Sequence, residues 1–176
     1  GVIESVLNLH NEAKPTATLT AVHVEHPEYY GVLKTEGQKV VGIVEKPAPE
    51  VGTDNPINAG AYVFSTNIFE AIRRTKTSPR GEREITDSIR LFIEEGKPVV
   101  AAKIPAEEWL DVGKPWDLLE ANTRVLTRIK PEILGSVEEN VHLKGQVFVS
   151  NGATIRSGAY IEGPAFIGEA SDVGPN

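Results

Sequence analysis

The residues best suited to chemistry are a carboxylate and an ammonium side by side, Glu45 and Lys46, at the end of the apolar run 40–44. Pro47 follows, and because it lacks a backbone donor it ends the predicted strand. A carboxylate accepts hydrogen bonds from hydroxyl groups, and an ammonium neutralises a phosphate. The pair therefore suits a polyhydroxylated, phosphorylated ligand. A solvated surface pair is the alternative, since Glu and Lys usually lie in water.

A second group of polar residues follows the loop that begins after Pro47. Asn58-Ala59-Gly60 leads directly into the apolar run 61–64, so a second strand brings an amide to the same rim as the acid and the base. Gly60 has no Cβ, which lets a ligand approach its backbone closely. The sequence thus predicts that Glu45, Lys46 and Asn58 lie together.

Hydrophobic spacing and turn residues predict the elements that position these groups. Helices are expected from residue 2 to the stop at Lys14-Pro15, from an Asn67 cap to Arg74, from a Thr86 cap to about Glu95, and from Pro115 to Ile129. Strands are expected at 17–24, 30–35, 39–45, 59–64 and 99–104, with 109–112 a short strand or loop. Strands alternating with helices predict an α/β domain with a mixed sheet, spanning residues 1–130.

From residue 131 the pattern changes to a six-residue repeat. Aliphatic residues recur at Val137, Leu143, Val149, Ile155, Ile161, Ile167 and Val173, and two places earlier stand Gly135, Val141, Val147, Ala153, Ala159, Ala165 and Ser171. Such hexads predict a parallel β-helix of triangular section over residues 131–176, with the aliphatic residue inside and the smaller one at the corner. Because a β-helix needs a cap, further coils or another chain are expected after Asn176.

Composition narrows the class of protein. A net charge of −7 argues against nucleic acid as a partner, because no basic surplus neutralises phosphates. With no cysteine, no signal peptide and no membrane-length apolar run, a soluble cytoplasmic protein without a membrane partner is expected. The chain opens at Gly1 and contains no methionine, so we expect a fragment of a longer chain.

Five short motifs, in order, resemble those of the sugar-1-phosphate nucleotidylyltransferases. They are Tyr30-Gly31-Val32, Glu45-Lys46-Pro47, Asn58-Ala59-Gly60-Ala61-Tyr62, Arg80-Gly81-Glu82 with Glu84-Ile85-Thr86-Asp87, and Trp109-Leu110-Asp111-Val112-Gly113-Lys114-Pro115-Trp116. With the hexads, the chain most resembles the bifunctional archaeal type, which joins this domain to a left-handed β-helix with acetyltransferase activity. The resemblance implies the C-terminal half of a Rossmann-like nucleotide-diphospho-sugar transferase sheet, followed by the start of a left-handed parallel β-helix of hexapeptide repeats.

The resemblance also implies roles for single residues. Tyr30 and Gly31 would line a sugar pocket, Glu45 would hold sugar hydroxyls, and Asn58 and Gly60 would contact the ring and its substituent. Lys46 would neutralise the sugar phosphate. Asp111 would be one of two aspartates that hold Mg²⁺, so Lys46 and Asp111 are the expected catalytic residues. The partners would be a sugar 1-phosphate and a nucleoside triphosphate.

The sequence departs from the family in one respect. The family's glycine-rich triphosphate loop and first metal aspartate are missing, and no Gly-x-Gly pair occurs. We therefore expect the chain alone to be inactive. For Asp111, a role in a turn or a helix cap remains the alternative to metal binding. Thr86 and Asp87 are interpreted as a helix cap, and Glu84 as a solvated acid. The four histidines show no metal-ligand spacing.

A non-catalytic regulatory or scaffold subunit is the alternative function, since similar domains joined to β-helices also serve as scaffolds. Either way a homo-oligomer, a trimer through the β-helix, is expected. The residues near Asn58 do not separate glucose from N-acetylglucosamine, and no acetyltransferase residue is assigned.

Overall fold

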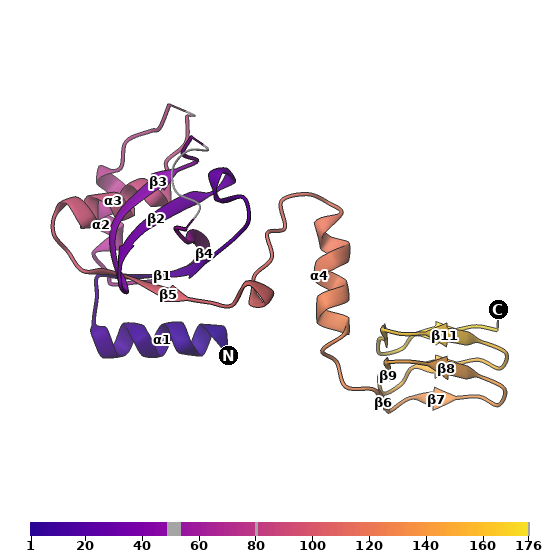
Figure 1. The fold of residues 1–176 in the computed structure, drawn as a ribbon. Coiled ribbons are helices and arrows are strands. Elements are labelled where there is room, and N and C mark those ends of the chain that lie inside the picture. Colours follow the sequence, from indigo (N-terminus) through magenta and orange to yellow (C-terminus); the bar gives the residue numbers. More distant parts are fainter. Residues whose placement is uncertain (49–53, 80, 176) are drawn as a thin grey trace. The chain divides into compact units, whose positions relative to one another are not determined.

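A computed structural model describes residues 1–48, 54–79 and 81–175 (Figure 1). The chain divides into two units, Gly1–Leu110 and Asp111–Asn176, and each is described by itself. The domain boundary expected at residue 130 stays a prediction.

The described residues of the first unit are built on five strands. They are β1 (Ala17–Val22), β2 (Gly31–Glu36), β3 (Lys39–Glu45), β4 (Ile57–Phe64) and β5 (Val99–Lys103). Their order is β1-β4-β2-β3-β5, and the sheet closes because β5 pairs with β1 in parallel and with β3 antiparallel. The remaining pairs are antiparallel, so the expected mixed sheet is confirmed.

In the part of this unit that the structure describes, three α-helices flank the sheet: α1 (Val2–Ala13), α2 (Ile68–Arg74) and α3 (Ile85–Glu94). Helix α1 lies along β1 and β5, whereas α2 and α3 pack together on the other part of the sheet (Figure 1). Leu19, Leu33, Ile89 and Phe92 are almost fully buried in the core between α3 and the strands. None of the helices in the described ranges is long and apolar enough to cross a bilayer.

Several element boundaries differ from those expected. Strand β1 ends at Val22 and β4 begins already at Ile57. Asn67 precedes α2 but makes no side-chain capping bond. The expected Thr86 cap is wrong: α3 begins at Ile85, and Glu84 takes the extended backbone of a capping residue. Because the Ile85 side chain packs against the core, the helix starts two residues earlier than a Thr86 cap predicts, and Thr86 lies inside it.

The second unit begins with a loop and a helix. Residues 109–112 form no strand, and α4 covers Asp117–Leu126 and not 115–129. Asp117 Oδ2 accepts hydrogen bonds from the backbone N–H groups of Gly113 (3.1 Å) and Lys114 (2.8 Å), which closes the turn before the helix.

Short strands follow α4. They are β6 (Glu132–Ile133), β7 (Ser136–Val137), β8 (His142–Lys144), β9 (Val147–Val149), β10 (Thr154–Ile155), β11 (Tyr160–Glu162), β12 (Ala165–Ile167) and β13 (Asp172–Val173). They form three small sheets, β6-β9-β12, β7-β10-β13 and β8-β11. From β7 onward, each parallel pair joins residues three hexads apart, as in Ile155 with Val137 and Val173. The first pair, β6 with β9, joins residues 16 apart. Val149 and Ile155 are fully buried between the sheets.

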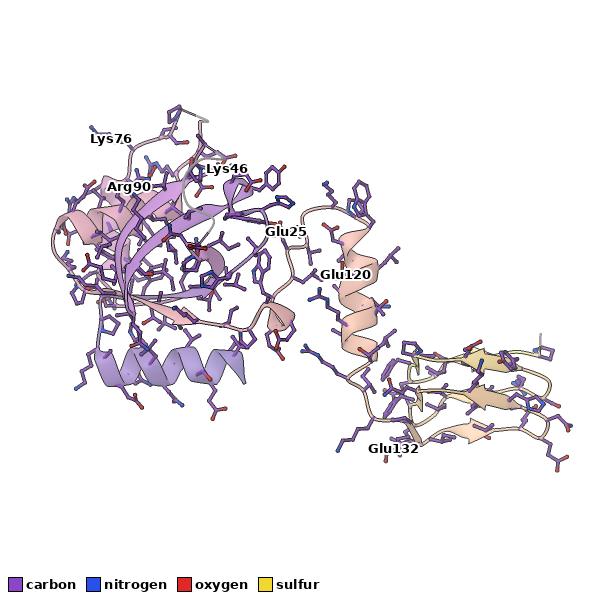
Figure 2. The ribbon with its side chains drawn as sticks, in the orientation of Figure 1. Glu25, Lys46, Lys76, Arg90, Glu120 and Glu132 are labelled. Atoms are coloured by element: carbon purple, nitrogen blue, oxygen red, sulfur yellow. The ribbon has the colours of Figure 1, made fainter. Side chains whose placement is uncertain are left out.

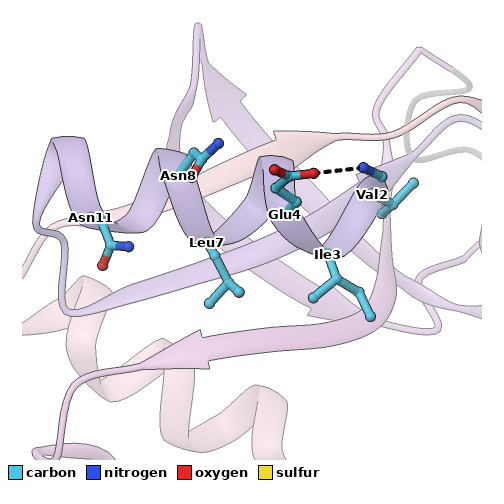
Figure 3. A pocket seen from close by; sticks show the side chains of 7 residues that line it. Val2, Ile3, Glu4, Leu7, Asn8 and Asn11 are labelled. Atoms are coloured by element: carbon cyan, nitrogen blue, oxygen red, sulfur yellow. Dashed lines mark hydrogen bonds and ion pairs between the residues drawn. The ribbon is translucent and has the colours of Figure 1, made fainter.

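The outer face of α1 carries a shallow apolar groove (Figure 3). Ile3 and Leu7 line it and remain exposed, while Glu4 accepts a hydrogen bond from the N-terminal ammonium at 3.1 Å. The polar side chains in this groove are Asn8, Asn11 and Glu4, a set that does not suggest a catalytic site.

Candidate functional site

The carboxylate of Glu45 and the side chain of Asn58 meet over Gly31. Gly31 pairs with Glu45 across β2 and β3, and β4 lies along the other edge of β2. A Cβ placed on Gly31 would lie 2.9 Å from Glu45 Oε2 and 3.8 Å from Asn58 Cβ. The structure thus brings together the acid and the amide that the sequence places at one rim, and glycine leaves room for both.

Lys46 is held by its backbone just beyond β3. Its N–H donates to the Tyr30 carbonyl at 3.0 Å, and its φ of 43° is left-handed. For a residue with a Cβ this conformation costs roughly 1–2 kcal/mol. Strained backbone of this kind gathers at ligand sites as well as at turns. The Lys46 side chain is exposed at the surface of the first unit (Figure 2).

A bulge in β4 shapes the rim around Asn58. Opposite β1, the register passes from Leu19 with Tyr62 to Ala21 with Asn58, so extra residues of β4 face Thr20. The buried Thr20 hydroxyl accepts from the Ala61 N–H (3.1 Å) and donates to the Ala61 carbonyl (3.0 Å). It replaces the ladder bonds that the bulge breaks. Bulges recur beside active sites, where they redirect a side chain.

Gly60 completes the bulge. Its φ of 88° favours glycine, and a Cβ built there would meet no atom within 4 Å. The backbone at Gly60 is therefore open to a ligand, as the sequence predicts.

The carboxamide of Asn58 is oriented by two hydrogen bonds. The Gly60 N–H donates to Asn58 Oδ1 at 3.2 Å, and Asn58 Nδ2 donates to the Tyr62 hydroxyl at 2.6 Å. Burial raises the pKa of Tyr62; the bond from Asn58 opposes this rise, and the charge of Glu45 adds to it. The hydroxyl of Tyr62 is therefore protonated at neutral pH.

Two aromatic residues, Tyr30 and Trp109, pack against the strands that carry these side chains. The Trp109 ring meets Tyr30 edge to face, with centroids 5.4 Å apart at 80°. Trp109 Nε1 also donates to the Ala59 carbonyl at 3.1 Å, which fixes the bulge from the second side. Both rings pack on a buried cluster that includes Val32 and Ile57. The sequence assigns neither Trp109 nor Tyr62 a role in the site. The only indication for either was its place inside a motif.

Thr86 also belongs to this site. Its Cγ2 would lie 3.7 Å from a Cβ on Gly31, and its side chain is buried. Within the described residues, Thr86 Oγ1 has no hydrogen-bond partner. Its role is thus to pack beside Gly31, and not to cap α3.

Asp111 begins the second unit, and its expected role as a metal ligand stays a prediction. Its carboxylate is exposed beside Gly113. No group of three or more acidic, histidine or cysteine side chains suited to a metal occurs in residues 1–48, 54–79 and 81–175. Mg²⁺ is often held by one or two carboxylates together with substrate phosphates, so a lone carboxylate fits part of such a site. Arg80, quoted with the fourth motif, lies outside the described residues.

Sequence comparison gives one family and a consistent set of relatives. Residues 3–128 match the family described as nucleotidyl transferase. The "bifunctional protein GlmU" of Methanocaldococcus jannaschii is 46% identical over 131 residues, which is 74% of this chain and 31% of that protein. A "bifunctional sugar-1-phosphate nucleotidylyltransferase/acetyltransferase" of Sulfurisphaera tokodaii is 40% identical over 162 residues, 90% of this chain and 39% of that protein.

A glucose-1-phosphate thymidylyltransferase of Streptomyces griseus is 36% identical over 174 residues, 98% of this chain and 48% of that protein. The chain therefore spans between about a third and a half of these relatives. Among solved structures, one described as a glucose-1-phosphate thymidylyltransferase of Bacillus anthracis, with sucrose, superposes with a TM-score of 0.55 and 28% identity, covering 68% of this chain and 47% of that one.

Proposed function

Since the chain belongs to the nucleotidyl transferase family, we propose that it serves nucleotidyl transfer from a nucleoside triphosphate to a sugar 1-phosphate, yielding a nucleotide sugar and pyrophosphate. The names of the relatives, a sugar-1-phosphate nucleotidylyltransferase and a glucose-1-phosphate thymidylyltransferase, support this substrate class. The described residues would form the part that binds the acceptor sugar.

One observation carries the proposal: the carboxylate of Glu45 and the side chain of Asn58 both lie beside Gly31, where no Cβ stands between them and the backbone. Sugar hydroxyls are both donors and acceptors, so they suit a carboxylate beside an amide. Gly31 and Gly60 would let the ring lie close to the backbone, and Tyr30 would wall the site.

Two further residues would help to neutralise the negative charge of the phosphates. The exposed ammonium of Lys46 stands one residue beyond Glu45, where it would neutralise the phosphate of the bound sugar. Asp111 would supply a carboxylate ligand to Mg²⁺, which when bound would add positive charge at the phosphates. Both residues are thus proposed to act in catalysis through charge.

The transfer itself asks little covalent work of the protein. The sugar phosphate oxygen attacks the α-phosphorus of the triphosphate, the bond to the pyrophosphate group breaks, and pyrophosphate leaves with its electron pair. This chain would orient the attacking phosphate, a contribution of position that can be large. Because its sequence holds no glycine-rich triphosphate loop, we expect the chain alone to release no pyrophosphate.

The stack of short strands is proposed to be the start of a left-handed parallel β-helix. Support comes from the parallel pairing of strands three hexads apart and from the buried Val149 and Ile155. A trimer formed through this stack, and acetyl transfer by a longer protein, follow as proposals; the second rests on the bifunctional relatives.

A scaffold or regulatory role is the competing proposal, and thermal stability separates the two. Glucose 1-phosphate or N-acetylglucosamine 1-phosphate at 100 times its Kd should stabilise the chain by about 2.7 kcal/mol, a rise in Tm of roughly 5–10 °C. Inorganic phosphate at the same concentration is the control and should have a much smaller effect. A chain whose Tm responds to no hexose or hexosamine phosphate would be a scaffold.

A further inference from the structure

The hydrogen bonds around Asn58 have a fixed direction. A backbone N–H can only donate, so the atom that faces Gly60 at 3.2 Å must be Oδ1. The other end of the carboxamide, Nδ2, carries only hydrogens. It must therefore donate to the Tyr62 hydroxyl at 2.6 Å, and the oxygen of Tyr62 accepts.

This direction decides where the proton of Tyr62 goes. Because the hydroxyl oxygen already accepts from Asn58, its own O–H points to another acceptor. No acceptor for it is found in the part of the chain that the structure describes. The Tyr62 ring is held in place by stacking on Phe64, with centroids 5.3 Å apart at 19°. A rigid, half-buried donor thus stands ready beside Asn58.

Glu45 completes the pattern. Glu45 Oε2 and Asn58 Cβ would lie 2.9 and 3.8 Å from a Cβ on Gly31, and Asn58 Nδ2 lies 2.6 Å from the Tyr62 hydroxyl. An acceptor and a donor therefore lie on the same rim, on either side of Asn58. A sugar hydroxyl can serve both at once, donating to the carboxylate and accepting from the tyrosine. Each bond strengthens the other in such a chain. A carbonyl, a hydrogen or a fluorine in place of that hydroxyl can make at most one of the two bonds.

We propose that Tyr62 determines substrate specificity, donating to one sugar hydroxyl that also donates to Glu45, with its direction set by Asn58. This inference rests on the proposed function. The site would therefore select a sugar 1-phosphate with a hydroxyl at this position over its deoxy or deoxyfluoro analogue.

The test is calorimetric titration of the 176-residue chain and its Tyr62→Phe variant with glucose 1-phosphate and its single deoxy and deoxyfluoro analogues. Tyr62→Phe keeps the ring that stacks on Phe64 and loses only the hydroxyl. Affinity for glucose 1-phosphate should fall about 3- to 10-fold. For one deoxy analogue, variant and wild type should bind equally weakly. Tyr160→Phe, at an exposed tyrosine of β11, is the matched control and should bind as wild type does.

Three results would overturn the inference. Equal affinity of variant and wild type for glucose 1-phosphate would show that the Tyr62 hydroxyl does not bind the sugar. An equal loss with every analogue would show that the hydroxyl acts only through Asn58. If Tyr62→Phe does not fold, the wild-type chain decides: it must lose affinity for the deoxy and the deoxyfluoro analogue at one shared position, and no such position would contradict us. A wild-type chain that binds no hexose or hexosamine phosphate would instead refute the proposed function itself.

Discussion

Replacing Gly31 by alanine should disable sugar binding while sparing the fold. The added Cβ would lie 2.9 Å from Glu45 Oε2, too close, whereas Thr86 Cγ2 at 3.7 Å and Asn58 Cβ at 3.8 Å are in ordinary contact. The crowded atom is the end of a flexible side chain, so the carboxylate moves and the backbone stays. Losing a hydrogen bond to a charged group costs roughly 1.5–3 kcal/mol, which is about 10- to 150-fold in affinity.

Stability should change little, because Gly31 does not have a positive φ. Alanine there restricts the unfolded chain, a gain of about 0.4–1 kcal/mol that offsets the displaced carboxylate. The assay is calorimetric titration with glucose 1-phosphate or N-acetylglucosamine 1-phosphate, paired with denaturant unfolding. Gly42→Ala is the matched control: it lies in β3, and its added Cβ would meet the Lys34 side chain at an ordinary 3.5 Å.

Two outcomes of Gly31→Ala would refute this reasoning. If it binds sugar phosphate as tightly as Gly42→Ala and the wild type do, Glu45 does not hold the ligand from the position that the structure gives it. If it loses several kcal/mol of stability, the clash is relieved by the backbone and not by the carboxylate.

Three further predictions concern charge and packing. Lys46→Gln should weaken binding of the sugar 1-phosphate about tenfold and leave binding of the free sugar unchanged; an equal loss for both ligands would contradict a phosphate contact. Ile155→Ala should cost about 2–5 kcal/mol in denaturant unfolding, because Ile155 is fully buried, whereas Val137→Ala at the same hexad position but 36% exposed should cost far less. The hydrogen bond from Arg156 lowers the pKa of Asp172 below its ordinary 3.8, so the pair stabilises the folded state above that pH and its contribution is lost as pH falls through the lower, folded-state pKa. The Tm of Asp172→Asn should therefore fall less steeply below about pH 4 than that of the wild type.

Local patterns predicted most of the framework. Strands β2 and β3 lie within one residue of the expected ranges 30–35 and 39–45, and the turn that joins them holds Gly37 with a positive φ. Of the hexad residues expected inside the second unit, Val149 and Ile155 are buried, whereas Val137 is 36% exposed. Glu45 and Asn58 were expected at one rim and do lie together over Gly31.

The supports of the site could not be predicted in the same way. Thr20 completes a bulge that arises only when β1 pairs with β4, and nothing in an alternating strand pattern marks a register shift. Trp109 reaches Ala59 from fifty residues away, so their contact depends on tertiary structure alone. Thr86 has the type and spacing of a helix cap, and only the packing of Ile85 against the core shows that it lies inside α3.

The most direct test of the central claim is an NMR titration of the ¹⁵N-labelled chain with a hexose or hexosamine 1-phosphate. If the acceptor sugar binds over Gly31, the Gly31 amide and the Asn58 side-chain NH₂ should shift in a saturable manner, while amides of the strand stack, such as that of Ile155, should not. Shifts confined to other residues, such as the arginine-lined groove of Arg74 and Arg90, or no shifts at all, would contradict the account.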